Sequence, residues 1–298
     1  MMPDTVAGFT ALRLANAQIE AWFIPDLGGR LVSLRARGGR EWCYHPGETL
    51  RLWTSPAGAP FTAGTFAGLD ECLPTIAPCR VDGRDLPDHG SCWNQAWERL
   101  PGEGIGLGLD LPDVPLRLER RATLAGTTLR LDYRLVHRGT RPERWGWAFH
   151  GLLSLAPGDR VQLPGVQQVA VEAQCLAEPL PAGTWAWPSP RADVHLDALD
   201  LGPGATYAKV LAGPLAEGRA AVVAQDGQAL EVRWPVREHP WCGLWLTRGG
   251  FQGQHTVALE PTNLPCDSLA QAGDRAAVLA PGATATWWVE VRLTPPGG

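Results

Sequence analysis

The sequence contains no apolar run near the roughly 18 residues that a membrane-spanning helix requires, and it shows almost no helical periodicity. Lysine is nearly missing, with Lys209 as the single example, and the 26 basic residues are outnumbered by 31 acidic ones. The resulting net charge of −5 gives no basic surface for nucleic acid or for an anionic membrane. We therefore expect neither of these partners.

Disulfide chemistry is also poorly supported. The chain has seven cysteines, an odd number, at positions 43, 72, 79, 92, 175, 242 and 266. No secretory signal is recognisable at the N-terminus, so the pattern favours reduced thiols in a cytoplasmic protein.

Several motifs of cofactor-dependent and nucleophilic enzymes are missing. There is no Gly-x-Ser-x-Gly nucleophile elbow, no Walker phosphate-binding loop and no His-x-His pair of the cupin type. Cys72, Cys79, His89 and Cys92 could be imagined around zinc, but their spacing differs from the paired Cys-x2-Cys form of structural zinc sites. The sequence therefore predicts no metal and no other cofactor.

Alternation with a period of two is the dominant pattern that is present. In LRLDYRL (129–135) the apolar residues occupy one face and the charged residues the other. The segments 19–24, 116–119, 230–234 and 286–293 behave in the same way. Successive side chains of a strand point to opposite faces, so these segments are predicted to be half-buried strands.

Glycine and proline punctuate these strands. The 35 glycines and 27 prolines are scattered singly, as expected of turns between many short strands. The best helical candidate is one short turn within 267–273. We predict a single all-β domain over residues 1–298, built as an antiparallel sandwich.

The first candidate functional residue is His89. It lies in LPDHGSCWNQAW (86–97), between a turn-type Asp and Gly, and Trp93 and Trp97 follow it. A loop histidine is often only a solvated surface residue, and tryptophan is more often core than ligand platform. Fourteen tryptophans are nevertheless many, and sugars present C–H faces that stack on indole.

The second candidate, His150, ends the alternating run RWGWAFHG (144–151). It is the largest side chain on a face otherwise occupied by Gly146 and Ala148, which leaves room for a pocket. A hydrogen-bonded core histidine is the simpler alternative.

The third candidate is Glu260, in VALEPTNLPCDSLA (257–270). It follows an apolar run and precedes the proline that ends the strand. Carboxylates are rarely buried without a partner. Glu260 is therefore either solvated at a rim or paired inside a cleft.

Together with GLDECLPTIAPC (68–79), these segments resemble the galactose mutarotase-like family, the aldose 1-epimerases. A first His before Gly, a second His on a mid-chain strand and a Glu near the C-terminus occur in the family's order. The resemblance covers nearly the whole chain and is strongest to the family's less characterised bacterial branch.

The resemblance implies a β-supersandwich and the interconversion of the α and β anomers of a free aldose without a cofactor. It implies that His89 binds the sugar near its ring oxygen, that His150 is the general acid and that Glu260 is the general base. With His89, the expected substrate-binding residues are Asp70 and Glu71 from segment 68–79 and Trp93 and Trp97 from segment 86–97. The expected protein is a monomer or a homodimer with a small-molecule sugar as its partner.

Two departures from the family put the identity of the substrate in question. Gly151-Leu152-Leu153 stands where a Tyr-Phe-Asn type sequence is usual in the family. The Asp that contacts sugar hydroxyls in the family cannot be assigned among Asp193, Asp197 and Asp226.

Three alternative functions remain open. A hexose-6-phosphate epimerase would need converging arginines such as Arg30, Arg80 and Arg84. A glycoside hydrolase would need two carboxylates, such as Glu71 and Glu260. A non-catalytic sugar-binding protein needs only the aromatic wall.

Overall fold

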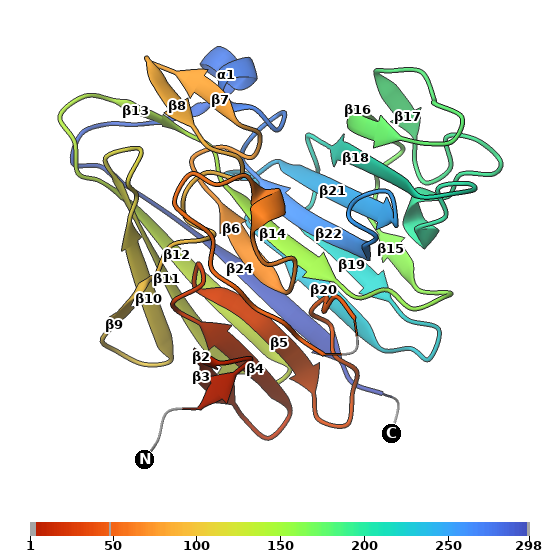
Figure 1. The fold of residues 1–298 in the computed structure, drawn as a ribbon, viewed down its shortest axis with the longest axis horizontal. Helices are drawn as coiled ribbons and strands as arrows, with labels where there is room; N and C mark the ends of the chain where they lie inside the picture. Colours follow the sequence, from red (N-terminus) through yellow and green to blue (C-terminus); the bar gives the residue numbers. More distant parts are fainter. Residues whose placement is uncertain (1–3, 48, 297–298) are drawn as a thin grey trace.

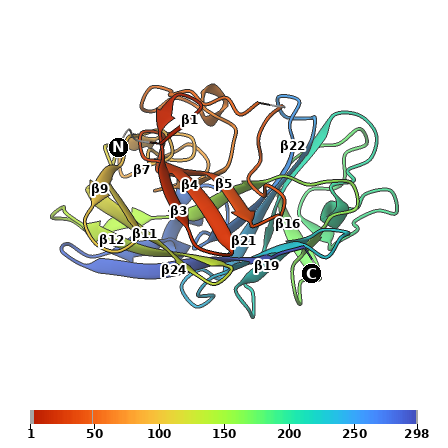
Figure 2. The same cartoon turned by 90° about the horizontal axis from the view of Figure 1, so that it is seen from below.

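The alternating segments form two large antiparallel sheets that pack against each other (Figures 1 and 2). This computed structural model describes residues 4–47 and 49–296. The predicted antiparallel all-β architecture is confirmed. Within the described ranges, no helix is long and apolar enough to cross a membrane.

The larger sheet has ten strands. In spatial order they are β17 (Thr184–Ala186), β16 (Gln168–Cys175), β18 (Thr206–Ala212), β21 (Trp241–Arg248), β22 (His255–Thr262), β14 (Ala148–Leu153), β6 (Leu69–Cys72), β5 (Arg30–Ala36), β4 (Ile19–Ile24) and β3 (Leu12–Ala15). Strands from both halves of the chain thus meet at β14, in the middle of the sheet.

The second sheet has eight strands. Their order is β15 (Arg160–Gln162), β19 (Arg219–Val223), β20 (Ala229–Arg233), β24 (Thr284–Thr294), β12 (Thr128–His137), β11 (Leu116–Ala125), β10 (Ile105–Asp110) and β9 (Glu98–Leu100). In Figure 2 the long strands β24 and β12 lie beneath β4 and β5 of the larger sheet.

The remaining elements are short. Three two-stranded ladders join β1 (Thr5–Val6) to β2 (Phe9–Thr10), β7 (Cys79–Val81) to β8 (Arg84–Leu86), and β13 (Glu143–Trp145) to β23 (Ala277–Leu279). The predicted helical turn is confirmed as α1 (Leu269–Ala272), whose first turn is capped by Ser268 accepting from the Gln271 N–H. Single 3-10 turns occur at η1 (Phe61–Ala63), η2 (Leu196–Ala198) and η3 (Gly273–Arg275).

The core between the sheets is built from the inward residues of the alternating strands. On β12, Leu129, Leu131, Tyr133 and Leu135 are buried, whereas Asp132 and Arg134 are exposed. These residues pack against Trp287 and its alternate neighbours on β24. The strand predictions at 19–24, 116–119, 230–234 and 286–293 are confirmed in the same way.

The central strands of the larger sheet are buried on both faces. All six residues of β14 are buried, because the opposite sheet covers one face and a long loop covers the other. That loop contains η1, and its Phe61 and Phe66 pack on Leu152 and Ala258. In Figure 1 it passes over β6 and β14. The loop therefore closes a space above the middle of the larger sheet.

Candidate active site

A row of charged side chains crosses the centre of the ten-stranded sheet under this loop. His150 lies opposite Asp70 in the β14–β6 ladder, and the neighbouring β14–β22 pairs place Glu260 on its other side. In spatial order the row contains Arg30 (β5), Asp70 (β6), His150 (β14), Glu260 (β22) and Lys209 (β18). The histidine thus lies between two carboxylates, and each carboxylate has a cation on its outer side.

The Asp70 carboxylate fixes the His150 ring. Asp70 Oδ1 lies 2.7 Å from His150 Nδ1, and its other oxygen lies 2.5 Å from the Arg30 guanidinium. All three side chains are almost completely buried. Burial alone would raise the pKa of Asp70, but Arg30 and His150 together lower it below its usual value. Asp70 therefore stays ionised and keeps the Nδ1 proton of His150, which leaves Nε2 free for chemistry.

His89 is held by an unusual turn. Its φ of +61° is in the left-handed region, which costs a non-glycine residue about 1–3 kcal/mol. The next residue, Gly90, also has a positive φ, and a Cβ there would lie 1.9 Å from the Leu73 carbonyl oxygen. Strain of this kind is typical of functional positions. The turn places the His89 ring next to that of His150, with the ring centroids 5.0 Å apart.

Two contacts orient the His89 ring within that turn. Its Nδ1 lies 2.8 Å from Asp88 Oδ1, and its face stacks on Phe61 at 4.0 Å. Burial and the neighbouring His150 lower the pKa of His89, although Asp88 opposes this change. The His89 ring is consequently neutral near pH 7. Like His150, it has a carboxylate on Nδ1.

Glu260 is buried and paired rather than solvated at a rim. Its Oε2 accepts from the ammonium of Lys209, while Oε1 has no hydrogen-bond partner among the described residues. Gly243 is on β21, which lies between the strands of Lys209 (β18) and Glu260 (β22). A Cβ at this position would be 3.0 Å from Glu260 Oε2 and 3.4 Å from Lys209 Nζ. The missing side chain makes room for the ion pair. Glu260 therefore keeps one oxygen available as an acceptor.

Asp267 adds a further carboxylate on the loop after β22. Its Oδ1 lies 3.7 Å from Lys209 Nζ. Burial lowers the pKa of Lys209, but Asp267 and Glu260 reverse this and raise it above its usual value. Burial beside Glu260 raises the pKa of Asp267. The lysine is thus fixed as an ammonium between two acidic groups.

These groups surround one cavity of about 240 Å³. This volume is below the roughly 300–1,000 Å³ of sites for drug-sized ligands, and it suits a small molecule. The ionisable lining residues are Asp88, His89, His150, Lys209, Glu260 and Asp267. The aromatic ones are Phe61, Phe66, Trp245 and Phe251. His89, His150 and Glu260, the three residues singled out in the sequence, therefore line the same cavity.

The structure corrects the expected role of Glu71. Glu71 follows Asp70 on β6 and so points to the opposite face, into the core between the sheets. There it accepts from Arg120, Tyr133 and Trp147 at 2.9, 2.7 and 2.8 Å. Burial, only partly offset by these donors, raises the pKa of Glu71 to about 7. It does not reach the cavity, so Glu71 and Glu260 are not a glycosidase pair.

Asp70 also differs from its expected role as a substrate-binding residue. Its side chain has no exposed surface and does not line the cavity. It contacts His150 and Arg30 instead. Asp70 therefore positions the histidine and does not contact a ligand directly.

The prediction that Trp93 or Trp97 walls the site is wrong. Trp93 packs edge-on behind Phe61 and donates to the Asp88 carbonyl, and Trp97 lies in the main core against Arg120. No strand spans residues 93–97, and both rings are almost completely buried. The indole that does line the cavity belongs to Trp245, on β21.

The arginines considered for a phosphate group do not converge. Arg30 is paired with Asp70, Arg80 with Asp85 and Arg84 with Glu143. Among the described residues, no arginine lines the cavity. The structure gives no support for a phosphorylated substrate.

The mid-chain carboxylates that might have contacted sugar hydroxyls lie elsewhere. Asp193 is paired with Arg191, Asp226 is bonded to Gln228 and Asp197 is in η2. None of the three lines the cavity. The additional carboxylate at the site is Asp267, which lies only seven residues after Glu260 in the chain.

The imagined zinc quartet is not assembled either. Cys92 donates to the Glu71 carbonyl, and Cys79 lies 3.5 Å from the Thr75 hydroxyl. Cys72 alone of the three cysteines stays close to His89, and His150 joins them there. Sequence spacing could not reveal this grouping, because β14 lies more than seventy positions from Cys72 along the chain.

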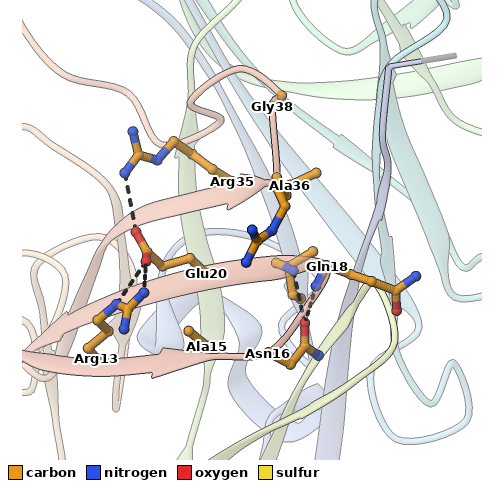
Figure 3. Close-up of a pocket in the computed structure, with 11 residues that line it drawn as sticks. Arg13, Ala15, Asn16, Gln18, Glu20, Arg35, Ala36 and Gly38 are labelled. Atoms are coloured by element: carbon orange, nitrogen blue, oxygen red, sulfur yellow. Dashed lines mark hydrogen bonds and ion pairs between the residues drawn. The ribbon is translucent and has the colours of Figure 1, made fainter. Parts of the chain in front are cut away.

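A second hollow lies on β3, β4 and β5, away from the charged row. Figure 3 shows the residues that line it. The Glu20 carboxylate accepts a hydrogen bond from Arg13 and lies 3.3 Å from the Arg35 guanidinium. Its volume of about 410 Å³ exceeds that of the cavity at His150, but Arg13 and Arg35 are half exposed and paired with Glu20. Exposed pairs of this kind contribute little. No acid–base group suited to catalysis gathers there.

We compared the chain with known protein families, curated proteins and solved structures. No protein-family model matches the chain, and no curated protein matches its sequence. Solved structures do match over nearly the whole length. The Slr1438 protein from Synechocystis sp. PCC 6803 has 16% sequence identity and a TM-score of 0.73, with 99% of this chain and 98% of that chain covered.

Two further matches have more informative names. A protein from Escherichia coli K12, provisionally assigned as an aldose 1-epimerase, shows 17% identity and a TM-score of 0.71, with 96% of this chain and 99% of that chain covered. A galactose mutarotase-like protein from Lactobacillus casei ATCC 334 shows 14% identity and a TM-score of 0.66, covering 95% and 100%. The chain therefore has the antiparallel β-sandwich fold of the galactose mutarotase-like proteins.

Proposed function

We propose that this protein is an aldose 1-epimerase, an isomerase that interconverts the α and β anomers of a free aldose. One observation carries the proposal: His150 lies between Asp70 and Glu260 in one row and lines a small cavity together with His89 and Glu260. An acid and a base at adjacent positions match a reaction in which one proton leaves the substrate while another arrives.

Glu260 is the general base. Its Oε2 is occupied by Lys209, so the unpartnered Oε1 takes the proton from the anomeric hydroxyl. As that hydroxyl becomes a carbonyl, the bond between C1 and the ring oxygen breaks. The buried ammonium of Lys209 holds the carboxylate in position for this step.

His150 is the general acid. Protonated, it donates Nδ1–H to Asp70 and Nε2–H to the ring oxygen as the ring opens. Glu260 is then neutral as an acid and His150 is neutral as a base. After rotation about the C1–C2 bond, the carbonyl is attacked from its other face and the two protons return. General acid–base catalysis of this kind contributes about 10²–10⁴-fold.

His89 and the aromatic residues hold the sugar. The strained turn fixes His89 beside His150, where its Nε2 binds near the ring oxygen. Trp245 and Phe251 offer faces for the sugar's C–H groups, and Asp267 accepts from hydroxyl groups. Lys209 is the only Lys or Arg among the described lining residues and is already paired, which favours a neutral sugar over a phosphorylated one.

Anomer exchange tests the proposal directly. Two-dimensional NMR exchange on a panel of hexoses and pentoses, with chelator present, should show faster interconversion than buffer for at least one neutral aldose. Phosphorylated sugars serve as the comparison. No acceleration for any sugar of the panel would refute the enzymatic assignment. A cytoplasmic location and a monomeric or homodimeric state stay predictions from the sequence.

A further inference from the structure

Cys72 is a potential ligand that the proposed acid–base chemistry does not use. It lies two residues after Asp70 on β6, opposite Ala148, and so on the same face as His150. It is fully buried. One ligand atom from each of Cys72, His89 and His150 lies within 4.8 Å of the others.

This combination of side chains matches the preferences of zinc. Thiolate sulfur and imidazole nitrogen are its usual ligands, at about 2.3 and 2.0–2.1 Å. Those bond lengths place tetrahedral ligand atoms about 3.5 Å apart, so even atoms at the 4.8 Å limit need to approach each other by only about 1 Å.

The surroundings of both histidines also resemble a metal centre. Each ring has a carboxylate on Nδ1, Asp88 for His89 and Asp70 for His150. Metal-binding histidines almost always donate their second nitrogen to such a group, which fixes the tautomer and strengthens the ligand. In both rings the nitrogen left for a metal is Nε2.

The charge balance around the site favours a dication. Four carboxylates face two basic side chains here: Asp70, Asp88, Glu260 and Asp267 against Arg30 and Lys209. With neutral histidines the site carries two negative charges more than positive ones. Release of the Cys72 proton to solvent raises that excess to three, and a Zn²⁺ ion lowers it to one.

We propose that this site binds Zn²⁺ through Cys72 Sγ and the Nε2 atoms of His89 and His150, with the fourth position open to the cavity. A ring whose Nε2 is bonded to zinc has no proton to deliver there. Zinc and sugar therefore exclude each other, and Zn²⁺ is an inhibitor of the site. That last consequence rests on the proposed function, whereas metal binding itself does not.

Cobalt provides a spectroscopic test that is independent of activity. Co²⁺ titrated into the chelator-treated chain should bind once, give a thiolate-to-metal band in the near ultraviolet and give intense visible bands of tetrahedral cobalt. Zn²⁺ should abolish these bands by displacement. A cobalt spectrum without the thiolate band would overturn the proposal.

Substitutions identify the ligands. Cys72→Ala should lose the near-ultraviolet band and bind Zn²⁺ at least about tenfold more weakly, whereas Cys175→Ala removes an exposed thiol and should behave as wild type. Asp88→Asn should weaken Zn²⁺ about 10–100-fold through its ring contact. Equal affinity in Cys72→Ala and wild type would contradict the assignment.

X-ray absorption of the zinc-loaded wild type covers the case in which Cys72→Ala fails to fold. The expected shell has one sulfur at about 2.3 Å and nitrogen at about 2.0 Å, and a shell without sulfur would disprove the site. In the kinetic arm, Zn²⁺ should raise the apparent KM for sugar, and chelator should restore it. If no sugar is turned over, the proposed function fails, but the cobalt and absorption data still decide the metal site.

Discussion

At the scale of single residues, the proposed mechanism assigns His150 and Glu260 to the same step. Each would pass a proton that the other's action makes available, so removing either one should stop that step. Losses from groups that act as one unit do not multiply. This gives the two residues a kinetic signature that independent binding groups lack.

His150→Asn and Glu260→Gln should each reduce mutarotation on the order of 10²–10⁴-fold, and the double variant should be little worse than either. Polarimetry and NMR exchange measure these rates, with circular dichroism as the check on folding. Losses that multiply in the double variant would show that the two residues act separately. A folded Glu260→Gln protein with wild-type rates would remove Glu260 from the mechanism.

Lys209→Met should reduce stability. Removing one partner of a buried ion pair costs about 3–5 kcal/mol, because Glu260 is left as an unpaired buried charge. Urea unfolding tests this effect, and Lys209→Arg is the control that keeps the charge. Unfolding of Lys209→Met at the same urea concentration as wild type would argue against the ion pair as a support for the buried carboxylate.

The residues of the site differ in how far the sequence could indicate them. His89, His150 and Glu260 lie in recognisable segments. Asp267 lies in the recognisable segment 257–270 but was not singled out there. Lys209 has no motif, and it approaches Glu260 only because β18, β21 and β22 are neighbours in space. Glu71 was misjudged for a reason already present in the sequence: adjacent residues of a strand face opposite sides, so Asp70 and Glu71 could not both face the cavity.

At the scale of secondary-structure elements, alternation of apolar and polar residues located the strands that have one face in solvent. β12 and β24 alternate because one face of each lies in the core and the other in solvent. β14 and β22 are buried almost throughout, so β14 shows an alternation of large and small residues and β22 the short apolar run 257–259. The sequence indicated both strands but not their neighbours in the sheet, because strand pairing joins segments that are far apart in the chain.

Gly243→Ala on β21 tests how tightly that part of the sheet is arranged. Alanine suits the backbone of a strand, but its Cβ would lie 3.0 Å from Glu260 Oε2 and press on the ion pair. We expect a folded protein with roughly tenfold lower kcat, since small displacements of catalytic groups are costly. Thermal unfolding and steady-state kinetics provide the measurements. Unchanged kcat would mean that the ion pair tolerates displacement.

At the scale of the whole molecule, buried polar groups connect the two sheets. Glu71 of the larger sheet bonds Arg120 and Tyr133 of the smaller one. His239 packs between Trp147 and Trp287, and neither of its ring nitrogens has a hydrogen-bond partner within the described residues. Burial lowers the pKa of His239 to about 3. Such a residue makes stability depend on pH.

The direction of that dependence follows from the lowered pKa of His239. The unfolded chain binds a proton at about pH 6.5, whereas the folded chain does so only near pH 3. Its contribution to stability is therefore complete above pH 6.5 and is lost as the pH falls toward 3. The loss between pH 6.5 and pH 5 is about 2 kcal/mol in the unfolding free energy.

His239→Phe should remove this part of the acid sensitivity, because a phenyl ring fits the same aromatic contacts and binds no proton. Urea unfolding at pH 7 and pH 5 provides the comparison, with the exposed His255→Gln as the matched control. Equal pH dependence in His239→Phe and wild type would mean that His239 is protonated at its usual pH in the folded protein.

The burial of Lys209 has a consequence for the surface as well. Lys209 is the only lysine of the chain, and both acidic neighbours keep it an ammonium inside the cavity. The only lysine side chain of the sequence is therefore buried and protonated, and neither state favours reaction with an electrophile. Open-chain aldehydes, which ring opening generates by necessity, form imines with free amines. Under the function proposed above, this arrangement keeps the open-chain sugar from modifying Lys209, and an amine-reactive dye should leave Lys209 unlabelled in the folded protein.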